Sequence, residues 1–189
     1  IDEPTLSIEF TVNNSPFVGQ SGKHVTMNKI KARLEHEKKA NISLTIDTSD
    51  VEHDRITVAG RGELHLSVLI EAMRREGYEF SVAKPKVVIK EVEGVKHEPI
   101  ERVHIDVPEE FSGAVIEELS KRKGEMQHLH TDEHGITSLE FLMPTRGLMG
   151  YRNEFLTITR GLGILTSIFE TFAPWRGEIK GRARGVMVC

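Results

Sequence analysis

The chain has 189 residues, of which 38% are hydrophobic and 29% are charged, and its formal net charge is −4. This composition is typical of a globular protein and excludes a disordered or low-complexity chain. One cysteine excludes a disulfide scaffold and favours a reducing compartment. No apolar run approaches the roughly 20 residues of a membrane helix. We therefore expect a cytoplasmic protein that does not engage a membrane.

The charge is distributed unevenly along the chain. Residues 146–189 carry seven basic and three acidic side chains, so this end is basic on an otherwise acidic protein. Such an asymmetry favours a surface that meets a polyanion, and a solvated run of charge is the alternative. The chain starts without methionine and ends in the strand-like stretch 186–189, so we expect a part of a longer protein.

The periodicity of apolar residues predicts two successive α+β units. Alternation predicts strands, and a spacing of three or four residues predicts helices. In the first unit we expect strands at 5–12, 42–46, 56–58, 78–82 and 86–91, and helices at 26–39 and 63–76. In the second we expect strands at 103–107, 125–131, 136–143 and 164–172, and helices at 111–123 and 144–159, after a linker at 93–99.

This order is β-α-β-β-α-β twice, the split βαβ or ferredoxin-like arrangement. The predicted fold class is therefore α+β, with tandem ferredoxin-like domains at 1–92 and 93–174. Residues 175–189 are rich in glycine and arginine and show no packing pattern of their own. We interpret them as the start of a further C-terminal domain.

Residues 18–26, with the sequence VGQSGKHVT, superficially resemble a phosphate-binding loop. A P-loop has four residues between its glycines and a Ser or Thr directly after its lysine. Here two residues separate Gly19 from Gly22, and His24 follows Lys23. The sequence therefore favours a surface turn before a helix capped by Thr26 over a nucleotide site.

Candidate metal and catalytic sites are weak. His128, His130 and His134 form an H-x-H-x₃-H cluster, and residues two apart on a strand share a face. A metal could use these imidazoles, but the expected cysteine or carboxylate ligands are sparse, so a polar strand face is favoured. No nucleophile, base and orienting group occur together. We expect no metal, no cofactor and no catalytic residue in this chain.

Basic residues beside glycine turns are the best candidates for RNA contact. Glycine lets a backbone approach a phosphate closely, and arginine offers it a planar fork. The Tyr151-Arg152 pair adds a ring for base stacking. Residues 121–123 close a helix, where complementing the helix dipole is an equally good explanation. The candidate RNA-binding residues are Lys121, Arg122, Arg146, Arg152, Arg160, Arg176, Lys180, Arg182 and Arg184.

Several motifs resemble those of a known family. The stretch GRGELHL at 60–66, with MRREG at 73–77 and VAKPKV at 82–87, resembles the third domain of translational GTPases related to elongation factor G. In the second unit EPI at 98–100 and RGLMGY at 146–151 resemble the fifth domain of that family. The two domains follow each other without a fourth, as in the BipA/TypA GTPases, which the chain therefore resembles most.

The resemblance implies a ribosome-associated GTPase involved in ribosome assembly, translation and stress adaptation. GTP and Mg²⁺ would bind an upstream G domain, so this chain itself would be no enzyme. It would contact ribosomal RNA and ribosomal proteins, with tRNA as a further candidate, act as a monomer, and relay the nucleotide state from that G domain. The alternative is a regulatory module of paired ferredoxin-like domains that binds a small molecule or dimerises.

Overall fold

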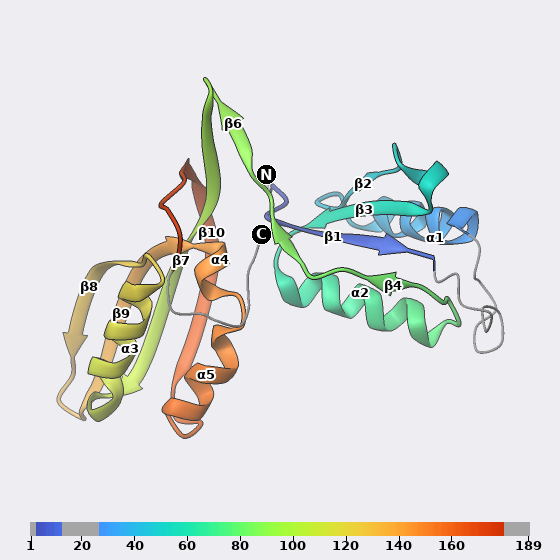
Figure 1. The fold of residues 1–189 in the computed structure, drawn as a ribbon. Helices are drawn as coiled ribbons and strands as arrows, with labels where there is room; N and C mark the ends of the chain where they lie inside the picture. The colour runs from blue at the N-terminus through green and yellow to red at the C-terminus, as the bar shows by residue number, and fades with distance from the viewer. Residues whose placement is uncertain (1–2, 13–26, 180–189) are drawn as a thin grey trace. The chain divides into compact units, whose positions relative to one another are not determined.

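The structure is a computed structural model that describes residues 3–12 and 27–179 (Figure 1). Contacts divide the chain into two compact units, Ile1–Val88 and Ile89–Cys189. Each unit has its own antiparallel sheet and its own buried core. The loop at 18–26 and the proposed cap Thr26 lie outside the described residues.

The first unit has five strands and two α-helices among its described residues. Its elements are β1 (Leu6–Thr11), α1 (Met27–Ala40), β2 (Thr45–Asp47), the 3-10 turn η1 (Val51–His53), β3 (Arg55–Gly60), α2 (Glu63–Arg75), β4 (Ser81–Val82) and β5 (Lys86–Val87). The sheet order is β2-β3-β1-β4, and β5 also pairs with β1. Each helix thus joins two strands that flank a third, which confirms the ferredoxin-like arrangement.

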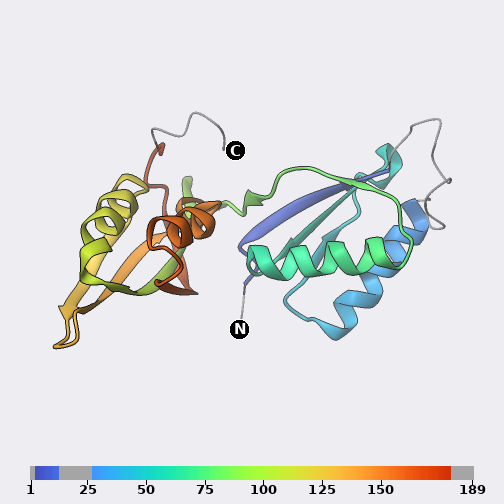
Figure 2. The same cartoon turned by 90° about the horizontal axis from the view of Figure 1, so that it is seen from below.

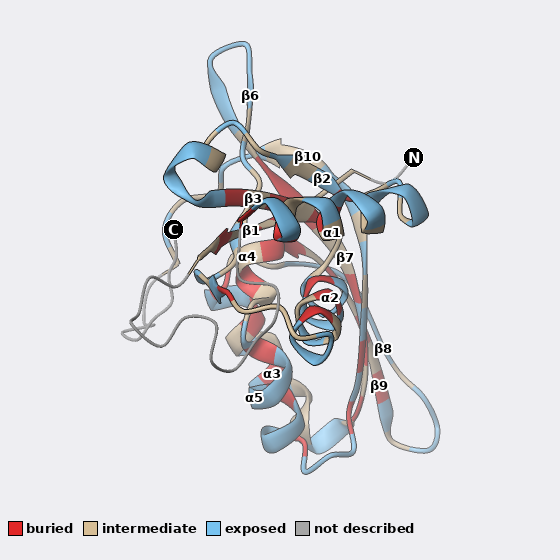
Figure 3. Cartoon of the chain, turned by 90° about the vertical axis from the view of Figure 1, so that its right-hand side faces the viewer, coloured by how far each residue is buried: buried red, intermediate tan, exposed pale blue. Residues whose placement is uncertain are grey.

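One face of the first sheet forms the core with both helices. Alternate residues of β1 are buried, because successive side chains of a strand point to opposite faces. The buried residues of the helices recur at helical spacing (Figure 3). This core includes Leu6, Ile8 and Phe10 of β1, Ile30 and Leu34 of α1, and Leu66, Leu69 and Met73 of α2.

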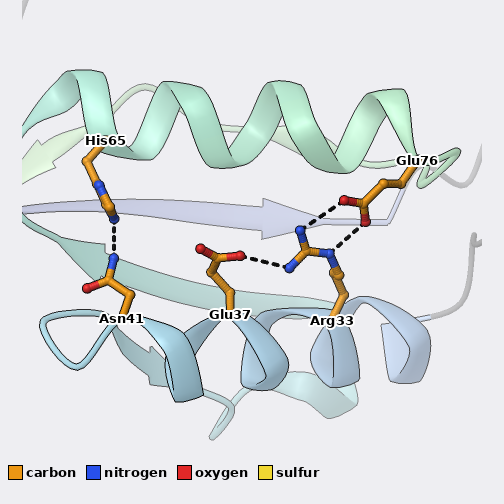
Figure 4. Close-up of polar contacts among 5 residues, drawn as sticks. All are labelled: Arg33, Glu37, Asn41, His65 and Glu76. Carbon is orange, nitrogen blue, oxygen red and sulfur yellow. Dashed lines mark hydrogen bonds and ion pairs between the residues drawn. The ribbon is translucent and has the colours of Figure 1, made fainter.

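Polar contacts also join α1 to α2 (Figure 4). The guanidinium of Arg33 donates to both carboxylate oxygens of Glu76, at 2.6 and 3.0 Å. At the other end the Asn41 amide nitrogen meets His65 Nε2. The Asn41 oxygen accepts from the backbone N–H and hydroxyl of Ser43, which leaves its amide N–H to donate to the imidazole. The two helices are therefore tied at two separate points.

The second unit repeats the same topology. Its elements are β6 (Lys90–Val92), β7 (Val95–Pro108), α3 (Glu109–Lys121), β8 (Glu125–Thr131), β9 (Ile136–Pro144), α4 (Thr145–Leu148), α5 (Tyr151–Ile158) and β10 (Ile164–Pro174). The sheet order is β10-β7-β9-β8, and β6 also pairs with β7. Helices α3 and α5 cover the same face of this sheet (Figures 1 and 2). The core between them contains Val103, Ile105, Val115, Leu119, Phe141 and Phe155.

The predicted linker at 93–99 is wrong. Glu93 and Gly94, both with positive φ, form the turn of a hairpin in which Val92 pairs with Val95. Strand β7 then begins at Val95. The single strand expected at 86–91 is divided, because β5 pairs with β1 of the first unit and β6 pairs with β7 of the second. The boundary between the two compact units therefore lies between Val88 and Ile89 rather than after residue 92.

Two further elements differ from expectation. The strand expected from Ile42 begins only at Thr45, and Ile42 is 92% exposed. The Asn41 side chain accepts the Ser43 N–H and holds a turn there instead. The helix expected at 144–159 is broken into α4 and α5 by Gly150, whose φ of 77° is a left-handed conformation that glycine tolerates.

Candidate nucleic-acid interface

Arg122 directly follows the last residue of α3 and is buried, with 2% exposure. Its Nη1 donates to the Gly147 carbonyl at 2.8 Å, and its Nε and Nη2 pair with Glu118 and Glu154. The guanidinium carbon is 4.8 Å from the centre of the Tyr151 ring. All of these partners belong to α3 or to the α4–α5 segment, so Arg122 links α3 to that segment. A phosphate could reach it only by displacing them.

Tyr151 is also buried, with 1% exposure, and its ring packs against Arg122 and Phe155. Burial raises the pKa of its phenol to about 12. The hydroxyl finds no hydrogen-bond partner among the described residues. From the sequence we expect the Tyr151 ring to stack on a base beside Arg152. In the structure this ring is part of the core.

Arg146 lies in α4 and faces a buried carboxylate. Its Nε and Nη2 donate to Glu98 at 2.5 and 3.1 Å, and Glu98 is 0% exposed. The guanidinium also donates to the Gly177 carbonyl and lies 3.6 Å from the centre of the Trp175 ring. These contacts occupy both the edge and the face of the guanidinium.

Arg176 is held on the same side of the second unit. Its backbone N–H donates to Glu98 at 2.8 Å. Its side-chain Nη1 donates to the carbonyls of Lys123 and Leu142, at 2.9 and 3.2 Å. The described tail residues therefore pack against the second unit, although their sequence shows no packing pattern.

Arg152 is exposed on α5 and reaches the edge strand β10. Its Nη1 donates to the Leu165 carbonyl at 3.0 Å, and its Nη2 is 3.4 Å from the Ser167 hydroxyl. These partners are neutral, so among the described residues no carboxylate is bonded to this side chain in competition with a phosphate.

The side chains of Lys121 and Arg160 are exposed and make no hydrogen bond or ion pair with another described residue, although the backbone N–H of Arg160 donates to the Thr157 carbonyl. Lys121 ends α3, while Arg160 follows α5 in a left-handed turn with Gly161. The eight residues of α5 span about 12 Å, so Arg152 and Arg160 lie at opposite ends of that helix. The structure therefore separates these two exposed arginines along the helix. Lys180, Arg182 and Arg184 lie outside the described residues.

The histidine cluster lies on β8 and in the turn that follows. His128 pairs across the sheet with Glu140, and His130 pairs with Ser138. No three His, Cys, Asp or Glu side chains in the described ranges are arranged to hold a metal ion. Within those ranges no helix is long and apolar enough to cross a membrane.

The chain is similar to known proteins in both sequence and fold. Residues 95–183 match the family model described as "Elongation factor G C-terminus". The second unit is thus similar to the C-terminal domain of elongation factor G. A solved structure from Thermus thermophilus matches the chain with a TM-score of 0.55 at 14% sequence identity. The match covers 93% of this chain and 41% of the Thermus protein. This likeness supports the fold alone.

The family follows from relatives that match over the whole chain. Proteins named "Large ribosomal subunit assembly factor BipA" are 52% identical in Bacillus subtilis, 50% in Synechocystis and 46% in Escherichia coli K12, in each case over 100% of the chain. The chain therefore belongs to the BipA/TypA family. It spans 31% of the length of these relatives.

Proposed function

We propose that this chain is the ribosome-binding part of a BipA-like factor that acts in assembly of the large ribosomal subunit. The observation that supports this most strongly is the 52% identity over the whole chain with a relative named for that process. The elongation factor G-like domain of the second unit supports the same function. Translation and stress adaptation would follow from correct subunit assembly.

We assign the phosphate contacts to the exposed cations of the second unit. Lys121 and Arg160 have no competing partner among the described residues, and Arg152 has only neutral partners. Lys180, Arg182 and Arg184 complete the proposed set. We exclude three residues from the proposed phosphate-binding set, namely Arg122, Arg146 and Arg176. Each already bonds to carboxylates or carbonyls of its own unit. The proposed partners are ribosomal RNA, ribosomal proteins and, beside them, tRNA.

GTP hydrolysis would require a G domain outside this chain, to which the two units would relay contacts from the ribosome. The loop at 18–26 supports this division, because it lacks the P-loop spacing and the hydroxyl that binds Mg²⁺. We propose a monomer in the cytoplasm that binds no cofactor itself. The alternative of a dimerising or metabolite-binding module rests on fold alone, and none of the relatives named above favours it.

The test is binding of the purified chain to separated large and small ribosomal subunits, followed by sedimentation at one salt concentration. The proposal predicts that the chain pellets with large subunits and not with small subunits, without added nucleotide. Equal partition, or no binding to either, would contradict it. Turnover of GTP by the chain alone would contradict the assignment of hydrolysis to another domain.

A further inference from the structure

The three residues after β10 remain bonded to the second unit. Strand β10 ends at Pro174, which still pairs with His97 of β7. The next residue, Trp175, donates its backbone N–H to the Lys96 carbonyl at 3.0 Å. The chain then reaches Gly177, where a φ of 91° turns it in a direction that other residues rarely adopt.

Glu98 is the buried group on which this path depends. Its carboxylate is 0% exposed and accepts three hydrogen bonds: two from Arg146 and one from the backbone N–H of Arg176. A buried carboxylate is costly unless it is paired and hydrogen-bonded. If the tail lifted away, Glu98 would lose one of its three donors inside the protein.

Arg146 joins this carboxylate to the tail. While its edge binds Glu98, its flat face lies 3.6 Å from the centre of the Trp175 ring, and it also donates to the Gly177 carbonyl. Arginine suits this place because its planar group can form a bidentate pair and stack on a ring together. The guanidinium therefore contacts the tail on both sides of Arg176.

We propose that Glu98, Arg146 and Trp175 form a latch that fixes residues 174–177 on the second unit and so sets the backbone direction at Gly177. The Arg176 side chain secures the closed latch, since it bonds to the carbonyls of Lys123 and Leu142. Glu98 and Arg146 are then positioning residues. This inference does not depend on the proposed ribosomal function.

The latch is tested by trypsin cleavage at the Arg176–Gly177 bond in the full chain, followed by mass spectrometry. Trypsin needs the local chain to open, so the cleavage rate follows the open population. Glu98→Gln removes the charge that Arg146 needs, and we expect cleavage at this bond to rise about 10-fold or more. Trp175 is the one tryptophan of the chain, so its quenching by acrylamide should rise in the same variant.

Glu101→Gln is the matched control, because Glu101 lies on the same strand, pairs across the sheet with Phe169 and is not part of the latch. It should cleave like the unchanged protein. Trp175→Leu tests the latch from the surface, since Trp175 is 38% exposed, and should accelerate the same cleavage even if Glu98→Gln fails to fold.

Unchanged cleavage at Arg176 in Trp175→Leu would overturn the proposal. So would a Glu98→Gln variant that is cut within β7–β9 as fast as at Arg176, because Glu98 would then support the whole core rather than the tail.

Discussion

Arg33 of α1 and Glu76 at the end of α2 face each other as a bidentate ion pair, with Nε–Oε1 at 2.6 Å and Nη2–Oε2 at 3.0 Å. Glu37, one turn along α1, accepts from the third nitrogen of the same guanidinium at 3.0 Å. The bonds to Glu76 and Glu37 raise the pKa of Arg33 above its ordinary value. The pair joins two helices through residues that are 43 positions apart in the sequence.

We expect Arg33→Lys to lower the free energy of unfolding of the first unit by about 1 kcal/mol, because lysine cannot form the two parallel bonds. Urea unfolding followed by circular dichroism measures this change. Glu35→Gln is the control, since Glu35 is exposed on the same helix and should change little. A double-mutant cycle with Glu76→Gln that shows no coupling would contradict the pairing.

Neighbouring cations of the second unit should differ sharply in their effect on stability. Arg122→Ala would leave a cavity and unpaired groups under α3, and we expect a loss of about 3–5 kcal/mol. Lys121→Ala removes an exposed side chain and should change stability by no more than about 0.5 kcal/mol. Urea unfolding monitored by Trp175 fluorescence compares the two. Similar losses for both variants would be inconsistent with the buried place of Arg122.

The buried phenol of Tyr151 predicts a loss of stability at alkaline pH. Its pKa is raised from 10.0 to about 12 by burial, so below pH 10 the phenol is protonated in both the folded and unfolded states. Between pH 10 and 12 only the unfolded chain ionises there. The free energy of unfolding therefore falls as pH rises, by at most about 2–3 kcal/mol from this group.

Phenolate absorbance, recorded during an alkaline titration, checks this shift. The step near pH 12 should be absent in Tyr151→Phe, which should also lose less stability between pH 10 and 12 than the unchanged chain. Ionisation of Tyr151 near pH 10 in the folded protein would contradict its burial.

The fold could be predicted because the spacing of apolar residues in each unit matches the period of its strands and helices. Alternation in β1 and the helical spacing of α1 and α2 locate those elements within a residue or two. The same reasoning placed the start of β2 too early, at Ile42. An apolar residue in a turn can continue an alternating pattern without belonging to the strand. The hairpin of β6 and β7 was missed because Glu93-Gly94 also reads as a flexible connection.

The role of Arg122 was within reach of the sequence. Val115, Leu119 and Arg122 continue one helical stripe, which places Arg122 on the inner side of α3 and Lys121 outside. Its charge suggested an exposed site instead. The burial of Glu98 has no comparable local signal, because its partners Arg146 and Arg176 are 48 and 78 residues away. Only the tertiary structure brings them together.

The most direct test of the central claim is the salt dependence of binding to large ribosomal subunits. Each phosphate that a cation neutralises contributes about 0.7–0.9 to the slope of log K against log salt concentration. Lys121→Ala combined with Arg160→Ala should therefore lower the slope by about 1.4–1.8, while Arg176→Ala should leave it unchanged. A slope that falls for Arg176→Ala but not for the Lys121 and Arg160 pair would contradict the account.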